Sequence, residues 1–155
     1  MSPPTDGVAQ YIIRNQSSTL YATLADRTPQ QWVTQKHDMG SDPSQIWQVS
    51  YNIETSMATI KNKGAGNYAV INDLTHFVVG DASPQEFELI PMSGVGNYYV
   101  IQVKNSDRVW HVAGSEEGAK LVARSDIDPK EDYANWWSFT LLPGAVSEGE
   151  GTTSL

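Results

Sequence analysis

Three histidines are the first residues whose chemistry would suit catalysis or metal binding. His37, His76 and His111 lie in unrelated contexts, and none has a second ligand at the spacing of a zinc motif such as His-Glu-x-x-His. The chain contains no cysteine and no Gly-x-Ser-x-Gly turn, so neither a thiol nor an exposed serine nucleophile is indicated. We therefore expect surface or half-buried histidines, with no metal and no cofactor.

Carboxylates are the other reactive groups. They gather in two turns, with Glu116 and Glu117 in one and Asp126, Asp128, Glu131 and Asp132 in the other. Paired acids hydrolyse glycosides only when they face each other across a cleft, whereas runs of charge usually face water. The glycine-rich residues 64–69 fit Gly-x-Gly-x-x-Ala, but a β pattern follows where dinucleotide binding needs a helix. We expect a protein that is not an enzyme.

Length and charge favour one acidic domain. A chain of 155 residues with 39% apolar residues is long enough to bury a core without metals or disulfides. Its net charge of −8 repels phosphates and anionic lipids, so we expect neither nucleic acid nor membrane as a partner. The first residues, MSPPTDG, show no basic or apolar signal region, and no 18-residue apolar run follows. We expect a cytoplasmic protein.

A short motif recurs three times along the chain. It reads SQIWQV, PQEFELI and ANWWSFTL around the anchors Trp47, Phe87 and Trp137, which are 40 and 50 residues apart. A second series repeats in the same phase, and its predicted equivalents are Ile13, Ile60 and Val103; Asn15, Asn62 and Asn105; and Tyr21, Tyr68 and Trp110. Three related units are therefore expected.

Each unit has a period near two and is rich in Val, Ile, Tyr, Trp and Thr, which predicts strands. The expected strands cover residues 10–14, 20–25, 31–36, 45–51, 57–62, 67–72, 76–80, 86–92, 97–104, 109–114, 119–124 and 136–142. Only the connection before the last strand suits a helical turn. Twelve strands in three units predict an all-β fold, the β-trefoil, in which the three anchor aromatics share one core. We expect a single domain with a core of about residues 8–142 and flexible tails at 1–6 and 143–155.

The repeated Gln-x-aromatic strands resemble the ricin-B type lectin trefoil over residues 10–142. Sugar-binding members of that family have an Asp two positions after the second-strand aromatic, which corresponds here to Thr23, Val70 and Val112. A pair of sugar hydroxyls needs a fixed acceptor of that kind. The resemblance therefore implies the fold, and we expect all three sites to be inactive.

A second resemblance is to the mycocypins, small fungal cysteine-protease inhibitors, and to the related cocaprins. It is carried by DGVAQYIIR, LYATLAD, QIWQVSY with ATIKNKG, and the terminal Trp-Ser-Phe-Thr at 137–140. This resemblance implies reversible inhibition of cysteine proteases, and also of aspartic proteases, by insertion of rigid surface loops into the active-site cleft. The partners it implies are papain-like, legumain-like or pepsin-like enzymes.

The resemblance also implies which loops make the contact. The first hairpin loop is Asn15, Gln16, Ser17, Ser18, Thr19 and Leu20, and the loop before the fourth strand is His37, Asp38, Met39, Gly40, Ser41, Asp42 and Pro43. A third loop, Gly64, Ala65, Gly66 and Asn67, would offer an Asn to asparagine-cutting proteases. Asn62 has repeat equivalents, which suits a side chain that caps its own turn, so Asn67 is the better candidate.

Two other functions stay open. A glycan-binding lectin would need aromatic, histidine and acidic side chains on one loop, and the best candidates are Asp107, Trp110 and His111. A trefoil whose loops bind some other protein is the third alternative.

Overall fold

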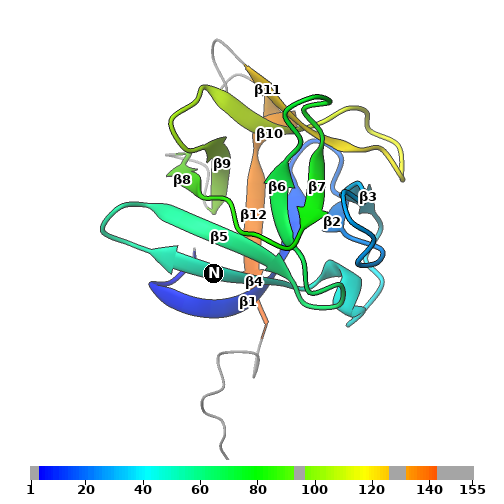
Figure 1. Cartoon of the computed structure of the whole chain (residues 1–155), viewed down its shortest axis with the longest axis horizontal. Coiled ribbons are helices and arrows are strands. Elements are labelled where there is room, and N and C mark those ends of the chain that lie inside the picture. Colours follow the sequence, from blue (N-terminus) through cyan, green and yellow to red (C-terminus); the bar gives the residue numbers. More distant parts are fainter. Residues whose placement is uncertain (1–3, 93–96, 126–131, 143–155) are drawn as a thin grey trace, which may run out of the picture.

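The computed structural model describes residues 4–92, 97–125 and 132–142, and it contains all twelve predicted strands (Figure 1). The strands are β1 (Gly7–Asn15), β2 (Tyr21–Thr23), β3 (Thr34–Lys36), β4 (Trp47–Asn52), β5 (Met57–Asn62), β6 (Tyr68–Ile71), β7 (Val78–Asp81), β8 (Phe87–Pro91), β9 (Tyr98–Val103), β10 (Arg108–Val112), β11 (Leu121–Ser125) and β12 (Trp137–Leu141). None of the described residues forms an α-helix. The all-β prediction is confirmed.

Six strands close a barrel and three hairpins cover one end of it. The antiparallel pairs run β1–β4, β4–β5, β5–β8, β8–β9, β9–β12 and β12–β1, which returns to the start. Each hairpin, β2–β3, β6–β7 and β10–β11, is attached through its first strand to β1, β5 or β9. Figure 1 shows the β2–β3 and β6–β7 hairpins on the right of the molecule and the β10–β11 hairpin across its top. This is the β-trefoil that the repeats predict.

Pairing registers reveal the threefold relationship and correct one predicted unit. The residues paired across the first hairpin of each unit are Arg14 with Tyr21, Lys61 with Tyr68, and Gln102 with Val109. The members of every pair are seven positions apart, so the three hairpins align without an insertion or deletion. The equivalent of Tyr21 and Tyr68 is therefore Val109, and the prediction of Trp110 at this position is wrong.

The same register corrects the predicted positions of Val103 and Asn105 in the third unit. Trp137 pairs with Asn15 and Trp47 with Asn62, whereas Phe87 pairs with Val103. Val103 thus takes the position predicted for Asn105. Asn105 instead lies in the β9–β10 turn with a left-handed backbone, at φ 62°, a conformation that Asn adopts more readily than most residues.

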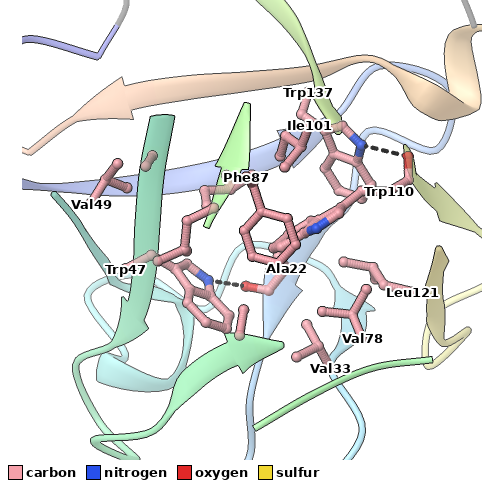
Figure 2. Packing of buried hydrophobic residues seen from close by; sticks show 14 of the residues in the cluster. Ala22, Val33, Trp47, Val49, Val78, Phe87, Ile101, Trp110, Leu121 and Trp137 are labelled. Carbon is pink, nitrogen blue, oxygen red and sulfur yellow. Dashed lines mark hydrogen bonds between the residues drawn. The ribbon is translucent and has the colours of Figure 1, made fainter. Parts of the chain in front are cut away.

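The barrel core is built around large aromatic side chains. Trp47, Phe87, Trp110 and Trp137 are fully buried, and Figure 2 shows them meeting inside the barrel. Trp110 packs edge-to-face against both Phe87 and Trp137, with ring centroids 5.5 and 5.9 Å apart. Each such ring removes about 150–250 Å² from water. The prediction that the three anchor aromatics share one core is confirmed.

Among the described residues, helical turns occur at two connections. The expected one is η3 (Tyr133–Asn135), capped by the Asp132 side chain, but a second, η1 (Pro43–Gln45), is capped in the same way by Asp42. Both precede a Trp-bearing barrel strand. The expectation that only the last connection would form a helical turn is therefore wrong, because Asp-Pro at 42–43 supplies a cap and a first helical residue.

The N-terminal residues 4–6 belong to the folded body, contrary to the expected tail. The Thr5 backbone N–H donates to the Tyr11 hydroxyl at 2.9 Å, and Asp6 accepts from the Ile53 backbone N–H at 2.9 Å. Residues 1–3 and 143–155, the remainder of the expected tails, lie outside the described residues. In the described part of the chain, no helix has the length and apolar character needed to cross a membrane.

Candidate functional site

The loop at residues 37–43 is largely exposed and is braced from below by one buried side chain. Gln45 donates through Nε2 to the His37 carbonyl at 2.8 Å and accepts from the Met39 backbone N–H at 3.0 Å. Asp42 accepts from the backbone N–H of Ser44 at 2.9 Å, and this hydrogen bond lowers the Asp42 pKa. The loop is therefore held in one shape before any partner arrives.

Residues 64–67 lie against the loop at residues 37–43. The Gly64 backbone N–H donates to the Pro43 carbonyl at 3.1 Å, and a Cβ on Gly64 would come within 3.0 Å of the Pro43 carbonyl carbon. Glycine is needed here for close approach of two backbones. Ala65 is buried rather than available for contact. Two of the three predicted protease-binding loops are thus brought together.

The remaining predicted loop, residues 15–20, makes its contacts elsewhere. Asn15 is fully buried and donates through Nδ2 to the Ala134 carbonyl at 2.9 Å. Ser18 donates to the Gln35 side chain at 2.6 Å. These hydrogen bonds lead to η3 and β3, not to residues 64–67, so the three loops do not form one continuous hydrogen-bonded edge.

The two asparagines around residues 64–66 have different roles. Asn62 is buried and its Oδ1 accepts from the Ala65 backbone N–H at 2.9 Å, which is the turn-capping role predicted for it. Asn67 is half-buried and donates through Nδ2 to the Arg27 carbonyl at 3.2 Å. The Asn67 side chain is therefore turned onto the β2–β3 connection instead of projecting from the loop tip.

Trp110 cannot serve as a sugar platform. Its indole ring is fully buried between Phe87 and Trp137, with no face open to a ligand. The prediction failed because an aromatic residue in a strand beside a loop was assumed to face outward. In the correct register Trp110 occupies the inward position that Ala22 and Ala69 hold in the other units.

Asp107 and His111, the other proposed sugar-binding residues, have separate contacts. Asp107 is exposed and accepts from the Ser125 hydroxyl at 2.9 Å. His111 is buried, not half-buried as expected, with Nδ1 2.8 Å from the Asn135 side-chain oxygen and Nε2 2.9 Å from an Arg124 nitrogen. Because Arg124 can only donate, Nδ1 carries the proton. His111 thus links η3 to β11.

The three positions implied by the ricin-B resemblance are internal as well. With the corrected register they are Thr23, Val70 and His111, not Val112 for the third. Thr23 is buried, and its hydroxyl oxygen accepts from Gln45 at 3.2 Å. His111 contacts the Asn135 side chain, which lies two residues before Trp137 as Gln45 lies two residues before Trp47. None of these positions carries a carboxylate, so the expectation of a missing acceptor holds for the corrected residues too.

The sequence reasoning missed a group of one exposed and two half-buried side chains where the three hairpins meet. Trp32, Phe77 and Lys120, which we name the cap cluster, occupy equivalent places: single bridges join Trp32 to Val79, Phe77 to Val122 and Lys120 to Thr34. Each precedes one buried residue of the core, and Figure 2 shows those residues, Val33, Val78 and Leu121, close together. The cap cluster therefore lies just outside the capped end of the barrel.

The cap cluster combines two aromatic rings with one cation. Trp32 is 46% exposed, its ring lies 6.2 Å from that of Phe77 in an edge-to-face arrangement, and Lys120 Nζ is 3.9 Å from the Trp32 ring centroid. This cation–π contact holds one side of the indole in place. The available signal was the alternation of Trp32 with the buried Val33 along the expected strand 31–36, which places Trp32 on the outer face.

A network of amide and carboxylate groups borders the cap cluster. Gln30 donates through Nε2 to Asp81 at 3.0 Å, and Asn72 donates through Nδ2 to Gln30 at 2.8 Å. The Asn72 backbone N–H in turn donates to the Phe77 carbonyl at 3.0 Å. We name Gln30, Asn72 and Asp81 the polar rim. It places planar hydrogen-bonding groups next to an exposed aromatic ring.

A shallow pocket of about 280 Å³ adjoins the other side of the cluster. Its lining includes Phe77, Lys120 and Glu116. The loop that carries Glu116 is fixed from beneath, since Gln35 Nε2 donates to the carbonyls of Gly114 and Glu116 at 2.8 and 2.9 Å. The pocket thus adds a carboxylate on a rigid support.

Among the described residues, no cluster of three or more His, Asp or Glu is placed to hold a metal ion. The ring N–H of His37 donates to Glu117, and this hydrogen bond lowers the Glu117 pKa. That pair links two surface loops, and both side chains are well exposed.

Comparison with solved structures identifies the fold. The chain is similar to a Macrolepiota procera ricin B-like lectin in complex with lactose, with 14% identity and a TM-score of 0.76 over 90% of this chain and 99% of the lectin. It is also similar to ThreeFoil, a designed 3-fold symmetric protein, with 14% identity and a TM-score of 0.74 over 86% and 99% of the two chains. The fold is a β-trefoil.

The trefoil also occurs as part of a much longer protein. A mosquitocidal holotoxin matches with 14% identity and a TM-score of 0.75 over 88% of this chain, which spans 17% of the holotoxin chain. No family model and no curated protein sequence matches. Identities this low establish the fold alone, so membership of the mycocypins or cocaprins stays a prediction.

Proposed function

We propose that this trefoil binds carbohydrate at the cap cluster and polar rim. The observation that carries the proposal is Trp32, a half-exposed indole on a rigid hairpin beside Gln30, Asn72 and Asp81. A sugar ring presents an apolar face to such an aromatic surface, while its hydroxyls need fixed donors and acceptors at the edge. The similar lectin that holds lactose supports the proposal at the level of fold.

The polar rim meets the requirement for orientation. Each primary amide has two N–H donors and one acceptor oxygen, and a carboxylate has about four acceptor positions. The Gln30–Asp81 and Asn72–Gln30 hydrogen bonds use part of this capacity, and backbone N–H groups occupy the Asn72 oxygen and one Asp81 oxygen. One N–H on each amide and further acceptor positions on Asp81 remain for a ligand. The hydrogen bonds also fix the side chains relative to one another, so a pair of vicinal hydroxyls would meet a prearranged set of partners.

The test is a glycan array followed by calorimetric titration of the sugars that bind. Trp32→Ala should weaken binding at least about tenfold, since losing a buried ring contact removes about 1.5–3 kcal/mol. Tyr133→Ala is the matched control, because Tyr133 is an aromatic residue with similar exposure on η3. Unchanged affinity in Trp32→Ala, or no bound sugar at all, contradicts the proposal.

Reversible protease inhibition is the second candidate function. It is supported by the exposed loop at residues 37–43, which Gln45 and Asp42 hold in a fixed shape and which residues 64–67 buttress. The test is a panel of papain-like, legumain-like and pepsin-like enzymes. Ser41→Arg at the exposed loop should abolish inhibition without altering sugar binding, and absence of inhibition in the unmodified chain removes this candidate.

For a legumain-like enzyme the structure gives a more specific expectation. The Asn67 side chain is occupied with the Arg27 carbonyl, so Asn67 would have to release that contact before entering a specificity pocket. Asn67→Lys with unchanged inhibition would remove Asn67 from the protease-binding surface. Loss of inhibition, with thermal stability unchanged, would place it there.

A further inference from the structure

A second pocket, of about 350 Å³, lies between the β6–β7 turn and the β10–β11 hairpin. Its lining includes His76, Arg108, Arg124 and Ser125. Two of the four arginines of the chain therefore face one hollow in a protein whose net charge is −8. Among the residues that the structure describes, no carboxylate belongs to the lining.

Arg108 is fixed in place on the floor of this pocket. Its Nε and its backbone N–H are 3.3 and 3.1 Å from the Ser106 hydroxyl oxygen. Nη1 lies 3.4 Å from His76 Nδ1 and 3.6 Å from an oxygen of Asp73. The Arg108 side chain is only 22% exposed, whereas that of Asp73 is 85% exposed, so water screens the acid much more than the base.

Arg124 is fixed from the opposite side. Its Nη1 donates to His111 Nε2 at 2.9 Å, and His111 is held in turn by the Asn135 side chain. Its Nη2 lies 3.9 Å from an oxygen of Asp132, which is an ion-pair contact too long for a hydrogen bond. A guanidinium oriented in this way needs little rearrangement to meet an oxyanion, because its planar donors match carboxylate and sulfate geometry.

The pocket and the cap cluster share a border. His76, in the pocket lining, directly precedes Phe77 of the cap cluster, and Val122, also in the lining, forms a bridge with Phe77. The cationic pocket therefore begins next to Phe77, and a ligand that covers the Phe77 ring could extend into it.

We propose that this pocket receives the carboxylate or sulfate group of an acidic saccharide whose neighbouring sugar lies on the cap cluster. The inference rests on the proposed carbohydrate function and specifies its ligand class. Arg108 supplies the main charge-assisted contact, and the side chains of Arg124 and Ser125, which already contact His111 and Asp107, line the same hollow. Neutral sugars would use the cap cluster alone and bind more weakly.

The experiment titrates lactose, 3′-sialyllactose and 3′-sulfolactose into the full chain at low ionic strength. The acidic forms should bind about tenfold or more tightly than lactose, which is typical of a charge-assisted hydrogen bond. Arg108→Gln should remove that preference and leave lactose affinity unchanged. Lys63→Gln, which changes the net charge equally at an exposed loop position, should keep the preference.

The outcomes separate the two proposals. Equal affinity for all three sugars, with loss of binding in Trp32→Ala, overturns the anion pocket and leaves carbohydrate binding intact. A preference that survives in Arg108→Gln also overturns the pocket. Binding that depends on Arg108 but not on Trp32 overturns the cap-cluster function on which the inference rests. No binding of any of the three sugars overturns the anion pocket, and the glycan array then decides whether the cap cluster binds another carbohydrate.

Discussion

Replacing single core tryptophans by phenylalanine should show whether buried hydrogen bonds, rather than ring volume alone, hold the hairpins to the barrel. Trp47 Nε1 donates to the Ala22 carbonyl at 3.0 Å, and Trp137 Nε1 donates to the Trp110 carbonyl at 3.1 Å (Figure 2). Trp110 Nε1, by contrast, has no hydrogen-bond partner among the described residues. The three rings are equally buried, so the comparison isolates the hydrogen bond.

The Ala22 carbonyl depends on this indole. Gln35, the residue paired with Ala22 across the hairpin, donates its backbone N–H to Ala119 instead. Trp47→Phe would therefore leave a buried carbonyl without its donor, at a cost of about 1–3 kcal/mol. The smaller ring adds about 1 kcal/mol for lost volume, at about 24 cal/mol per Å³ of cavity.

Trp110→Phe removes similar volume but also removes an unpaired donor. The two effects oppose each other, so its cost should be about 1 kcal/mol or less. We expect Trp47→Phe and Trp137→Phe to lose about 2 kcal/mol more than Trp110→Phe. Urea unfolding followed by circular dichroism measures the difference, provided that the three variants share one m-value. Equal losses in all three would refute the argument.

Three further predictions concern loops and turns. Gly64→Ala should cost about 1–3 kcal/mol in urea unfolding, because the added Cβ would lie 3.0 Å from neighbouring backbone; a neutral result would contradict the close approach. Asn15→Ala should cost about 1–3 kcal/mol, since the Asn15 side chain bonds two turn N–H groups and the Ala134 carbonyl. Asn105→Gly should be nearly neutral, because glycine readily adopts the φ of 62° found there. Equal losses of stability in the two variants would restore the predicted equivalence of these asparagines. The hydrogen bond from His37 lowers the folded-state pKa of Glu117, so its stabilisation is present above the ordinary value of 4.5 and is lost as pH falls through the lower folded value. Glu117→Gln should therefore reduce thermal stability at pH 6 but not in strong acid, and an equal reduction at both pH values would contradict it.

The fold was predictable because its determinants are periodic. Trp47, Phe87 and Trp137 recur on strands of period two, and the cores of trefoil units must be shared because no unit can bury its apolar face alone. The turn-capping role of Asn62 was also predictable, since its side chain bonds a backbone group three residues later. Local chemistry of this kind is legible in a sequence.

The third unit was misread because residue type was taken as a guide to position. Asn105 resembles Asn15 and Asn62 in type, and Trp110 resembles the tyrosines, but the hairpin length is conserved while the side chains are not. Side-chain volume explains why a tryptophan replaces an alanine at this position. Trp110 extends from β10 and fills the space beside Phe87, whereas the equivalent Ala22 is small and leaves room for Trp47. A core can satisfy the same total volume with large residues at different positions, and a sequence alone does not show which solution it uses.

The cap cluster could not be assembled from the sequence, because its three residues lie on different hairpins that only the strand bridges bring together. Its asymmetry bears on the proposed recognition. In a trefoil, each hairpin brings one outward residue to the place where the three units meet, directly before an inward residue such as Val33. Three identical residues there would present a symmetric surface to a ligand that is itself asymmetric. This chain has an indole, a phenyl ring and an ammonium at the three equivalent positions. Each therefore offers a different interaction, so a ligand bound across them has one preferred orientation. Under the proposed function, the repeated fold would supply the rigid support and the three different side chains of the cap cluster the specificity.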